Sequence, residues 1–243
     1  MKPVYSIKPN GDSALSVVFE TEISERVNNL VAALKEGLES SHIEGFHGCI
    51  PTYCSLLIQY DPLRINYEAW RELVDGLMGE SVSEERSGAT VYVIPVLYKG
   101  LDLEHVADAN GLTSKEVVEI HTAPIYRIYM LGFTPGFPYL GGMDERIATP
   151  RLSQPRTKIA AGSVGIAGKQ TGIYPIDSPG GWQIIGNTPV KLFDGKSVKP
   201  VLLEAGGYIQ FKSVSEEEYS RIEELVTAGN YTCETYCLGR GGL

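Results

Sequence analysis

Apolar and polar residues in the first 88 positions follow patterns that predict four strands and two helices. Apolar residues at helical spacing predict an amphipathic helix after Ser24, whose hydroxyl can cap it, and a second helix over residues 67–78. Strands rich in β-branched and aromatic residues are expected over residues 4–7, 14–19, 45–50 and 55–60. The order β-β-α-β-β-α predicts a small α/β domain over residues 1–88, ending in a polar linker over residues 79–88.

The rest of the chain predicts a second domain over residues 89–243, in which strands outnumber helices. Two patterns of a hydroxyl residue followed three positions later by glutamate predict helix starts. They are Thr113-x-x-Glu116, before a helix through His121, and Ser215-x-x-Glu218, before a helix over residues 216–228. A short helix is expected over residues 103–110, and strands over residues 90–96, 125–131, 198–203 and 208–214. Residues 239–243 are expected to fray.

A glycine-rich and proline-rich stretch over residues 132–189 interrupts this pattern. It holds eleven of the 27 glycines and seven of the 14 prolines, which excludes a helix. It also holds many large apolar residues that favour burial. The stretch is therefore expected to form ordered turns and short strands of a barrel-like core, whose backbone amides can bind anions or small polar ligands.

Charge and hydropathy exclude two classes of partner. The net charge of −9 argues against nucleic acid, and no apolar run approaches the length that spans a membrane. Residues 132–189, by contrast, hold five basic and three acidic residues, which favours a small anionic ligand. The first residues lack the apolar core of a signal peptide, so a cytoplasmic protein is expected.

The four cysteines are too few for a disulfide scaffold. Cys233 and Cys237 have a spacing that would place two thiolates on one helical face, but no complete metal site is indicated. Structural or incidental thiols are the favoured interpretation, and no metal is expected.

Two arginines bracket a proline-stiffened loop. Arg151 and Arg156 are placed to grip a carboxylate or phosphate with two hydrogen bonds each. The alternative is an ion pair with Asp144 or Glu145, and the sequence leaves both open.

The segment over residues 162–171 resembles a phosphate-binding P-loop but has the wrong spacing and no following helix. Lys169, Gln170 and Thr171 could still bind a polar ligand, or the segment could be a hairpin loop. Gly180 and Gly181 suggest backbone with positive φ and free amides, which suits an anion hole.

Aromatic residues are candidates for an apolar pocket floor, with core packing as the alternative. The pocket candidates are Phe133, Thr134, Phe137, Tyr139 and Trp182, together with His121. A histidine at a helix end is more often a cap or a core residue.

Four segments of the glycine-rich stretch resemble one known family. They are GFTPGFPYLGGMD (132–144), TPRL (149–152), PRTKIAAGSVGIAGKQTGIYP (155–175) and SPGGWQIIGNTP (178–189). The family is that of the 5-oxoprolinase B subunit, also called allophanate hydrolase subunit 1 and KipI, the sporulation kinase A inhibitor. Segments near Gly11, Pro51 and His121 also look like this family, so the resemblance covers nearly the whole chain.

The resemblance implies an α+β protein with a small α/β N-terminal domain and a cyclophilin-like β-barrel C-terminal domain. It implies that the chain works with the A and C subunits of 5-oxoprolinase in a complex that opens the lactam of 5-oxo-L-proline to L-glutamate with ATP hydrolysis. The chain would be inactive alone, and ATP would be held by the complex in a subunit that the sequence does not identify.

The resemblance leaves two other roles open. Some members of the family bind and inhibit a sporulation histidine kinase, for which an apolar groove around Phe133, Phe137 and Trp182 would serve. A biotin-dependent carboxyltransferase half would instead need a biotin carrier as partner. Asn187 stands where many relatives have arginine, and Ala160 where proline is expected.

Overall fold

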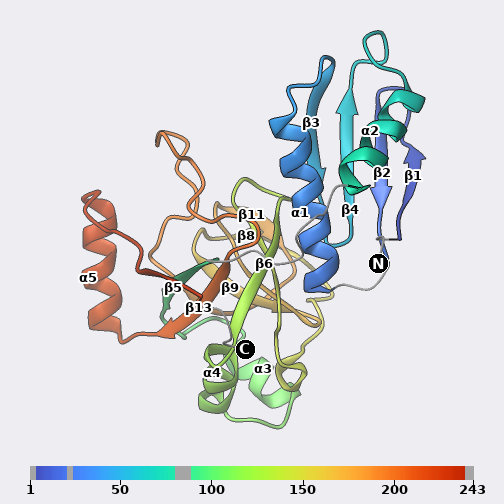
Figure 1. Cartoon of the computed structure of the whole chain (residues 1–243). Coiled ribbons are helices and arrows are strands. Elements are labelled where there is room, and N and C mark those ends of the chain that lie inside the picture. The colour runs from blue at the N-terminus through green and yellow to red at the C-terminus, as the bar shows by residue number, and fades with distance from the viewer. Residues whose placement is uncertain (1–3, 21–23, 80–88, 239–243) are drawn as a thin grey trace. The chain divides into compact units, whose positions relative to one another are not determined.

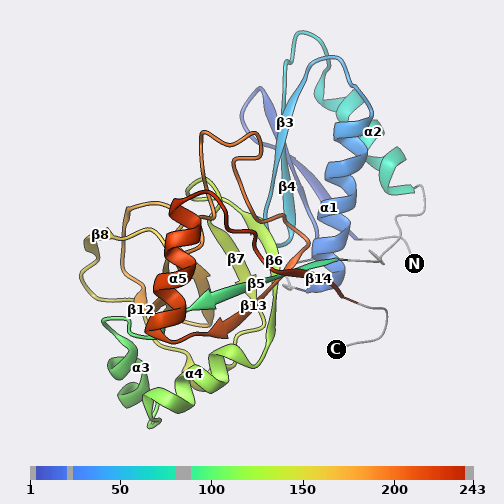
Figure 2. The ribbon, with the colours of Figure 1, turned by 90° about the vertical axis from the view of Figure 1, so that its left-hand side faces the viewer.

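The computed structural model describes residues 4–20, 24–79 and 89–238. The chain divides into two compact units, Met1–Ser87 and Gly88–Leu243, and most of their elements are labelled in Figures 1 and 2. Separate clusters of buried apolar side chains form the core of each unit. All but the first residue of the predicted linker over 79–88, and the segment 239–243 that was expected to fray, lie outside the described residues.

The first unit is an antiparallel sheet with two helices packed against one face. The sheet order is β1 (Ser6–Pro9), β2 (Ala14–Val18), β4 (Ser55–Tyr60) and β3 (Phe46–Pro51). Alternate residues of the two central strands are buried against α1 (Glu25–Ser40) and α2 (Tyr67–Gly79). The predicted order of elements is confirmed, and so is the cap, since the Ser24 hydroxyl accepts a hydrogen bond from the Val27 amide at 3.3 Å.

The second unit holds the remaining helices and strands. Its first half contains β5 (Thr90–Val96), α3 (Leu103–Ala109), α4 (Ser114–Thr122), β6 (Ile125–Leu131), β7 (Pro138–Gly141) and the 3-10 turn η1 (Glu145–Ile147). Its second half contains β8 (Arg156–Ile159), β9 (Ser163–Ala167), β10 (Gln170–Ile173), β11 (Ser178–Gly180), β12 (Gln183–Asn187), β13 (Tyr208–Ser213), α5 (Glu216–Thr227) and β14 (Thr235–Cys237). The glycine-rich stretch therefore forms short strands and turns, as predicted.

These strands form three sheets. The largest has the order β14-β5-β13-β6-β7, in which β13 runs parallel to β5 and antiparallel to β6. The others have the orders β10-β9-β12 and β11-β8. Among the described strands no sheet closes on itself, so the fold is a mixed α/β arrangement of several sheets, and the cyclophilin-like barrel stays a prediction.

One strand prediction near the C-terminus is wrong, and one strand was not predicted. No strand forms over residues 198–203, where the one isolated bridge joins Phe193 and Val201. Pro200 lacks an amide proton for a ladder, and its carbonyl instead closes a turn by accepting from the Asp194 amide at 2.8 Å. The sequence pattern also missed β14, because its three exposed residues carry no apolar alternation.

Both capping motifs of the second unit form. Thr113 and the Glu116 side chain make a reciprocal capping box at the start of α4, and the Ser215 hydroxyl accepts from the Glu218 amide at the start of α5. No helix among the described residues is long and apolar enough to cross a membrane.

Candidate functional site

A cavity of about 550 Å³ lies in the second unit, and we call it the lysine cavity. Its lining residues are Leu97, Lys99, Gly100, Leu101, Arg156, Lys158, Ile159, Ala160, Ser163, Ile184, Gly186, Asn187 and Tyr219. Three of them are cationic and none is acidic. The volume is in the range of small-molecule sites, and most of the exposed surface of the wall is apolar.

One wall of the lysine cavity is a loop that lies directly on β12. The amides of Leu97 and Asn187 donate to each other's carbonyl oxygens, at 2.9 and 3.0 Å. A Cβ atom at Gly100 would collide with the carbonyl of Ile184, and one at Gly186 would lie 2.7 Å from a methyl of Val96. The two glycines are therefore needed for this close approach of two backbones.

Arg156 and Asp102 form an ion pair that ties this loop to β8. The guanidinium donates to Asp102 Oδ1 at 2.7 Å and to the Trp182 carbonyl at 3.2 Å, while Asp102 Oδ2 accepts from the Ile184 amide at 2.6 Å. The Asp102 side chain is only 10% exposed and that of Arg156 27%. The alternative that Arg156 pairs with Asp144 or Glu145 is wrong, because its partner is Asp102.

The two lysines stand at the exposed rim of the lysine cavity. Lys158 pairs with Asp177 at 2.6 Å, and Lys99 pairs with Glu216 of α5. Hydrogen bonding to Lys158 lowers the pKa of Asp177, and hydrogen bonding to Lys99 lowers the pKa of Glu216. Both carboxylates lie outside the lining of the cavity.

Polar groups of β9, β12 and α5 complete the wall. The Tyr219 hydroxyl donates to Asn187 Oδ1 at 2.6 Å, and Asn187 Nδ2 donates to the Ala161 carbonyl at 3.3 Å. Ser163 is 6% exposed, and its hydroxyl has no hydrogen-bond partner among the described residues. The cavity thus combines cations, aliphatic walls and a free hydroxyl, which suits a small organic anion.

Both polar atoms of the Asn187 side chain are engaged in hydrogen bonds, although it is shorter than the arginine that many relatives have at this position. Its side chain links α5 to the turn before β9, through Tyr219 and Ala161. Ala160, the other position of difference, lines the lysine cavity.

Arg151 lies apart from Arg156 in its contacts. It is exposed, its guanidinium carbon is 5.9 Å from the centroid of the Trp182 ring, and it forms no ion pair with any described residue. A role for Arg151 in anion binding stays a prediction.

The segment over residues 162–171 is a hairpin of β9 and β10, as the alternative interpretation held. Its turn has Gly168 at φ 59°, and Lys169 pairs with Glu145 at 2.6 Å. Thr171 is fully buried and donates to the Gly165 carbonyl at 3.0 Å. Gln170 is half-buried at the start of β10. None of these three side chains lines the lysine cavity.

Gly180 and Gly181 do not have positive φ, so that expectation is wrong. Gly180 is instead required by close packing, because a Cβ there would collide with the Tyr174 hydroxyl and lie 2.9 Å from Ile159 Cδ1. A Cβ added at Gly181 would make only ordinary van der Waals contacts, at 3.5–3.8 Å.

The aromatic candidates are mainly a small core of their own. Phe137, Tyr174 and Trp182 are buried, and their rings meet edge to face with centroids 5.5–6.2 Å apart. Tyr139 packs against this group. Phe133 is different, because it is 69% exposed on a turn with φ 63°.

Thr134 follows Phe133 in the same turn, and its amide donates to the Gly132 carbonyl at 2.8 Å. Its hydroxyl is buried without a hydrogen-bond partner among the described residues. The turn therefore presents one aromatic ring to solvent while it encloses the polar residue next to it.

His121 is fully buried at the end of α4. The Thr171 hydroxyl donates to Gly165, so it must accept from His121 Nε2, at 2.8 Å. His121 Nδ1 then accepts from the Tyr98 hydroxyl at 2.7 Å. Burial lowers the pKa of His121 to about 3, so the ring is neutral with its proton on Nε2.

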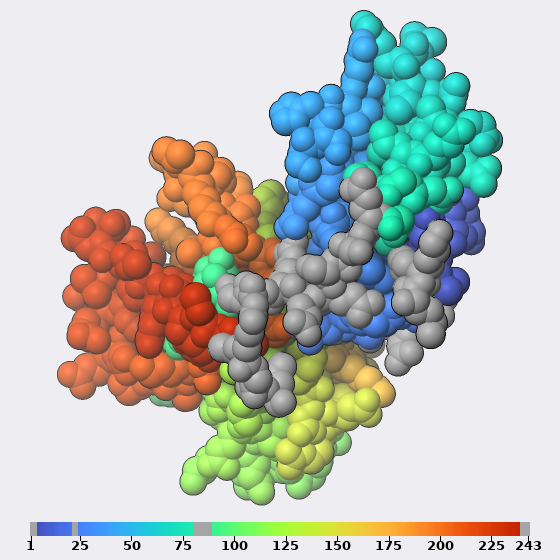
Figure 3. Space-filling model, in the orientation of Figure 1, coloured from blue at the N-terminus to red at the C-terminus, as the bar shows by residue number. Residues whose placement is uncertain are grey.

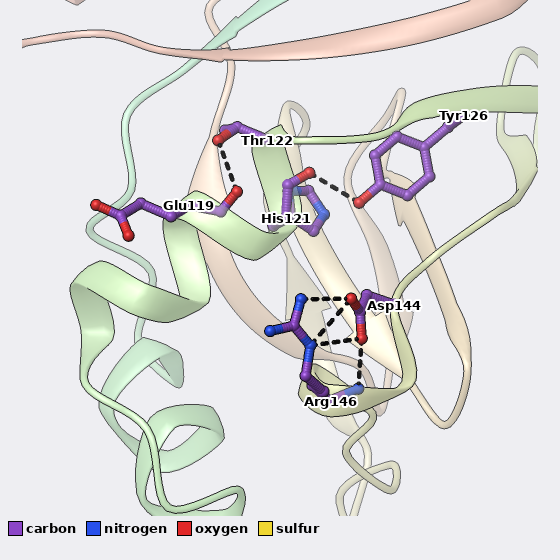
Figure 4. Close-up of polar contacts among 6 residues, drawn as sticks. All are labelled: Glu119, His121, Thr122, Tyr126, Asp144 and Arg146. Atoms are coloured by element: carbon purple, nitrogen blue, oxygen red, sulfur yellow. Dashed lines mark hydrogen bonds and ion pairs between the residues drawn. The ribbon is translucent and has the colours of Figure 1, made fainter. Parts of the chain in front are cut away.

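Figure 4 places His121 in its surroundings. The Tyr126 hydroxyl donates to the His121 carbonyl at 2.7 Å, and the nearby Asp144 and Arg146 form an exposed ion pair. His121 is enclosed by protein and does not line the lysine cavity.

A second cavity of about 500 Å³ lies near the C-terminal part of the same unit. It is lined by residues that include Lys191, Lys199, Tyr231 and Cys233. Burial raises the pKa of the Cys233 thiol to about 11, which makes it a poor nucleophile. Cys237 is in β14, so the expected helical face for the two thiols is wrong. The described residues contain no group of three or more histidine, cysteine or acidic side chains that could hold a metal.

Sequence reasoning missed Lys99, Lys158, Ser163 and Tyr219. Strand alternation could have found Lys158, because it is two residues from Arg156 in β8 and shares its face. Lys99 and Tyr219 come from distant segments that only the tertiary fold brings to the cavity.

Comparison with known proteins places these features in a family. Residues 5–203 match the family described as carboxyltransferase domain, subdomain C and D. The chain is 46% identical over 237 residues to the 5-oxoprolinase B subunit of Bacillus subtilis, which covers 90% of this chain and 97% of that protein. It is 42% identical to the 5-oxoprolinase B subunit of Haemophilus influenzae, over 67% of this chain and 74% of that protein.

Solved structures agree. The crystal structure of TTHA0988 is similar with a TM-score of 0.76 and 37% identity over 83% of this chain, which spans 40% of that one. The urea amidolyase of K. lactis shares the fold of this chain, with a TM-score of 0.80 and 21% identity. The match covers 98% of this chain and 16% of the urea amidolyase.

Proposed function

Because the chain belongs to the carboxyltransferase subdomain C and D family, and within it to the 5-oxoprolinase B subunits, we propose that it is the B subunit of an ATP-dependent 5-oxoprolinase. The observation that carries this proposal is the 46% identity to the Bacillus subtilis protein over 97% of that protein's length. The complex would convert 5-oxo-L-proline to L-glutamate and ATP to ADP and phosphate. The A and C subunits would be the partners.

The reaction needs groups that hold an anion and keep the lactam carbonyl in place. 5-Oxoproline carries a carboxylate, and a lactam is a poor electrophile whose ring opening must be coupled to ATP. Preorganised cations and hydrogen-bond donors are the means by which proteins stabilise such charge. This chain supplies cations at the lysine cavity, which supports the proposal that it forms one wall of a site shared with another subunit.

The β9–β10 hairpin gives no support for an ATP site on this chain. It is the segment most like a phosphate-binding loop, but it leads from strand to strand rather than from strand to helix. Its Lys169 is paired with Glu145. The proposal therefore leaves ATP to the complex as a whole.

The test is glutamate release from 5-oxo-L-proline by the three subunits co-expressed and purified together. We expect ATP-dependent release from the full set, and its loss when this chain is left out. Restored activity on adding the purified chain back would exclude an effect on expression of the other two subunits. Unchanged activity without this chain would contradict the proposal.

A second function is supported by one surface residue. Phe133 projects a largely exposed aromatic ring from a turn that is fixed by hydrogen bonds, as a protein-binding residue would. We therefore keep inhibition of a histidine kinase as the alternative. Autophosphorylation of the host's sporulation-type kinases would be measured with wild-type protein and with Phe133→Ala. Inhibition that is lost in the variant would support this function, and no inhibition by the wild-type protein would exclude it.

A further inference from the structure

We propose that the lysine cavity binds a small carboxylic acid. In the absence of this ligand, Glu216 of α5 forms an ion pair with Lys99, and the carboxylate of the ligand replaces Glu216 when it binds. The inference rests on the proposed function for the identity of the acid, 5-oxo-L-proline. The cavity itself is defined by the contacts of the second unit alone.

The charges around the lysine cavity favour an anion that can be exchanged. Arg156 is neutralised by Asp102 in a pair that is mostly buried, so it contributes a wall rather than a free charge. Among the described residues, Lys99 pairs with Glu216 and Lys158 with Asp177, and the side chains of these two acids are 64% and 53% exposed. Ion pairs of such exposed groups are weak and exchange readily with other anions.

The hydroxyl of Ser163 offers a hydrogen bond to a ligand. It lines the lysine cavity, its residue is 6% exposed, and it has no partner among the described residues. The hydroxyl faces the open space of the cavity, so it can donate to a ligand carbonyl or accept from a ligand amide that takes the place of water.

The wall of the cavity favours a ligand with an apolar body. Ile159, Ile184 and Leu97 give the cavity an aliphatic lining, which a hydrocarbon ring can cover. A ligand with a carboxylate at one end, a short ring and an amide matches this arrangement of cation, aliphatic wall and hydroxyl. Inorganic phosphate lacks the apolar body and would leave this wall uncovered.

Helix α5, which carries Glu216, is weakly attached. Ile222 is the one buried residue of this helix, all of which the structure describes. Its other ties to the cavity are the Glu216–Lys99 pair and the hydrogen bond from Tyr219 to Asn187. Figures 1 and 3 show the helix on the outer surface of the second unit. Exchange of Glu216 for a ligand carboxylate therefore needs little rearrangement of the core.

The test is calorimetric titration of the full chain with 5-oxo-L-proline. We expect saturable binding that is weakened about tenfold by Lys99→Gln, since a charged hydrogen bond is lost. Ser163→Ala should also weaken it, and 2-pyrrolidinone, the same lactam without a carboxylate, should bind more weakly than the acid. Glu216→Gln should tighten binding, by about threefold, because the competing carboxylate is gone.

Glu217→Gln is the matched control, since it removes the same charge from the next, exposed position and should leave binding unchanged. Circular dichroism would confirm that each variant is folded. Absence of saturable binding, or equal effects of the Glu216 and Glu217 variants, would overturn the inference. If the chain binds 5-oxo-L-proline but the three-subunit complex releases no glutamate, the proposed function is overturned and the assignment of the cavity stands.

Discussion

A neutral histidine in the core makes the stability of the second unit depend on pH. His121 has its pKa lowered to about 3 in the folded chain, against about 6.5 when it is unfolded. Below pH 6.5 the imidazole is therefore protonated in the unfolded chain but stays neutral in the folded chain. The contribution of neutral His121 to the free energy of unfolding is fully present above pH 6.5 and is lost as the pH falls toward 3.

We expect the second unit to lose about 2 kcal/mol of unfolding free energy from His121 between pH 7 and pH 5. Urea unfolding followed by Trp182 fluorescence, in a Trp70→Phe background that silences the first unit, would measure it. His121→Gln is less stable at every pH but should show a smaller loss over the same interval. Equal losses in the two proteins would contradict the prediction.

Adjacent glycines give a second prediction at the scale of single residues. Gly180→Ala should destabilise the second unit by about 2 kcal/mol, because the new methyl collides with the Tyr174 hydroxyl and Ile159. Gly181→Ala has only ordinary contacts and should be close to neutral. Thermal unfolding of the two variants measures the difference, and a neutral Gly180→Ala would refute the packing argument.

At the scale of elements, Asp102 connects a loop, a strand and a helix. It stands at the start of α3, where its side chain would be expected to cap the helix, yet it makes no capping hydrogen bond. Its carboxylate binds Arg156 and the Ile184 amide instead. A sequence pattern could predict the helix but not this use of the aspartate, because both partners are more than 50 residues away.

Asp102→Ala should therefore cost more than the loss of a cap. It leaves the largely buried Arg156 without its anion and the Ile184 amide without an acceptor, so a loss of about 2–3 kcal/mol is expected. Asp108→Ala, on the exposed side of the same helix, is the control and should change stability little. Chemical denaturation of both variants gives the comparison, and similar values for the two would rule out the structural role of the pair.

The same contrast explains what could be predicted from the sequence. Helix starts were predictable because a cap and its acceptor are three residues apart, as at Ser24, Thr113 and Ser215. The motifs of the glycine-rich stretch identified the family. The lysine cavity was not predictable, because Lys99 and Tyr219 are 120 residues apart and meet only through tertiary structure.

At the scale of the whole molecule, each unit has its own core, which predicts that the second can fold without the first. Residues 89–243 expressed alone should unfold in one cooperative transition and should bind 5-oxo-L-proline as the full chain does. Scanning calorimetry and the titration described above measure both properties. A fragment without a cooperative transition would show that the second unit depends on the first.

The pairing of β5 has a consequence for biosynthesis. This apolar strand is made early, but its parallel neighbour β13 and its other neighbour β14 follow more than 100 residues later. While the ribosome translates the intervening segment, both edges of β5 lack their final hydrogen-bonding partners, β13 and β14. The first unit can fold in that time, whereas the sheet of the second unit cannot be completed until β13 and β14 have been synthesised. Nascent chains are therefore most exposed to aggregation, and most in need of a chaperone, between the synthesis of β5 and that of β13.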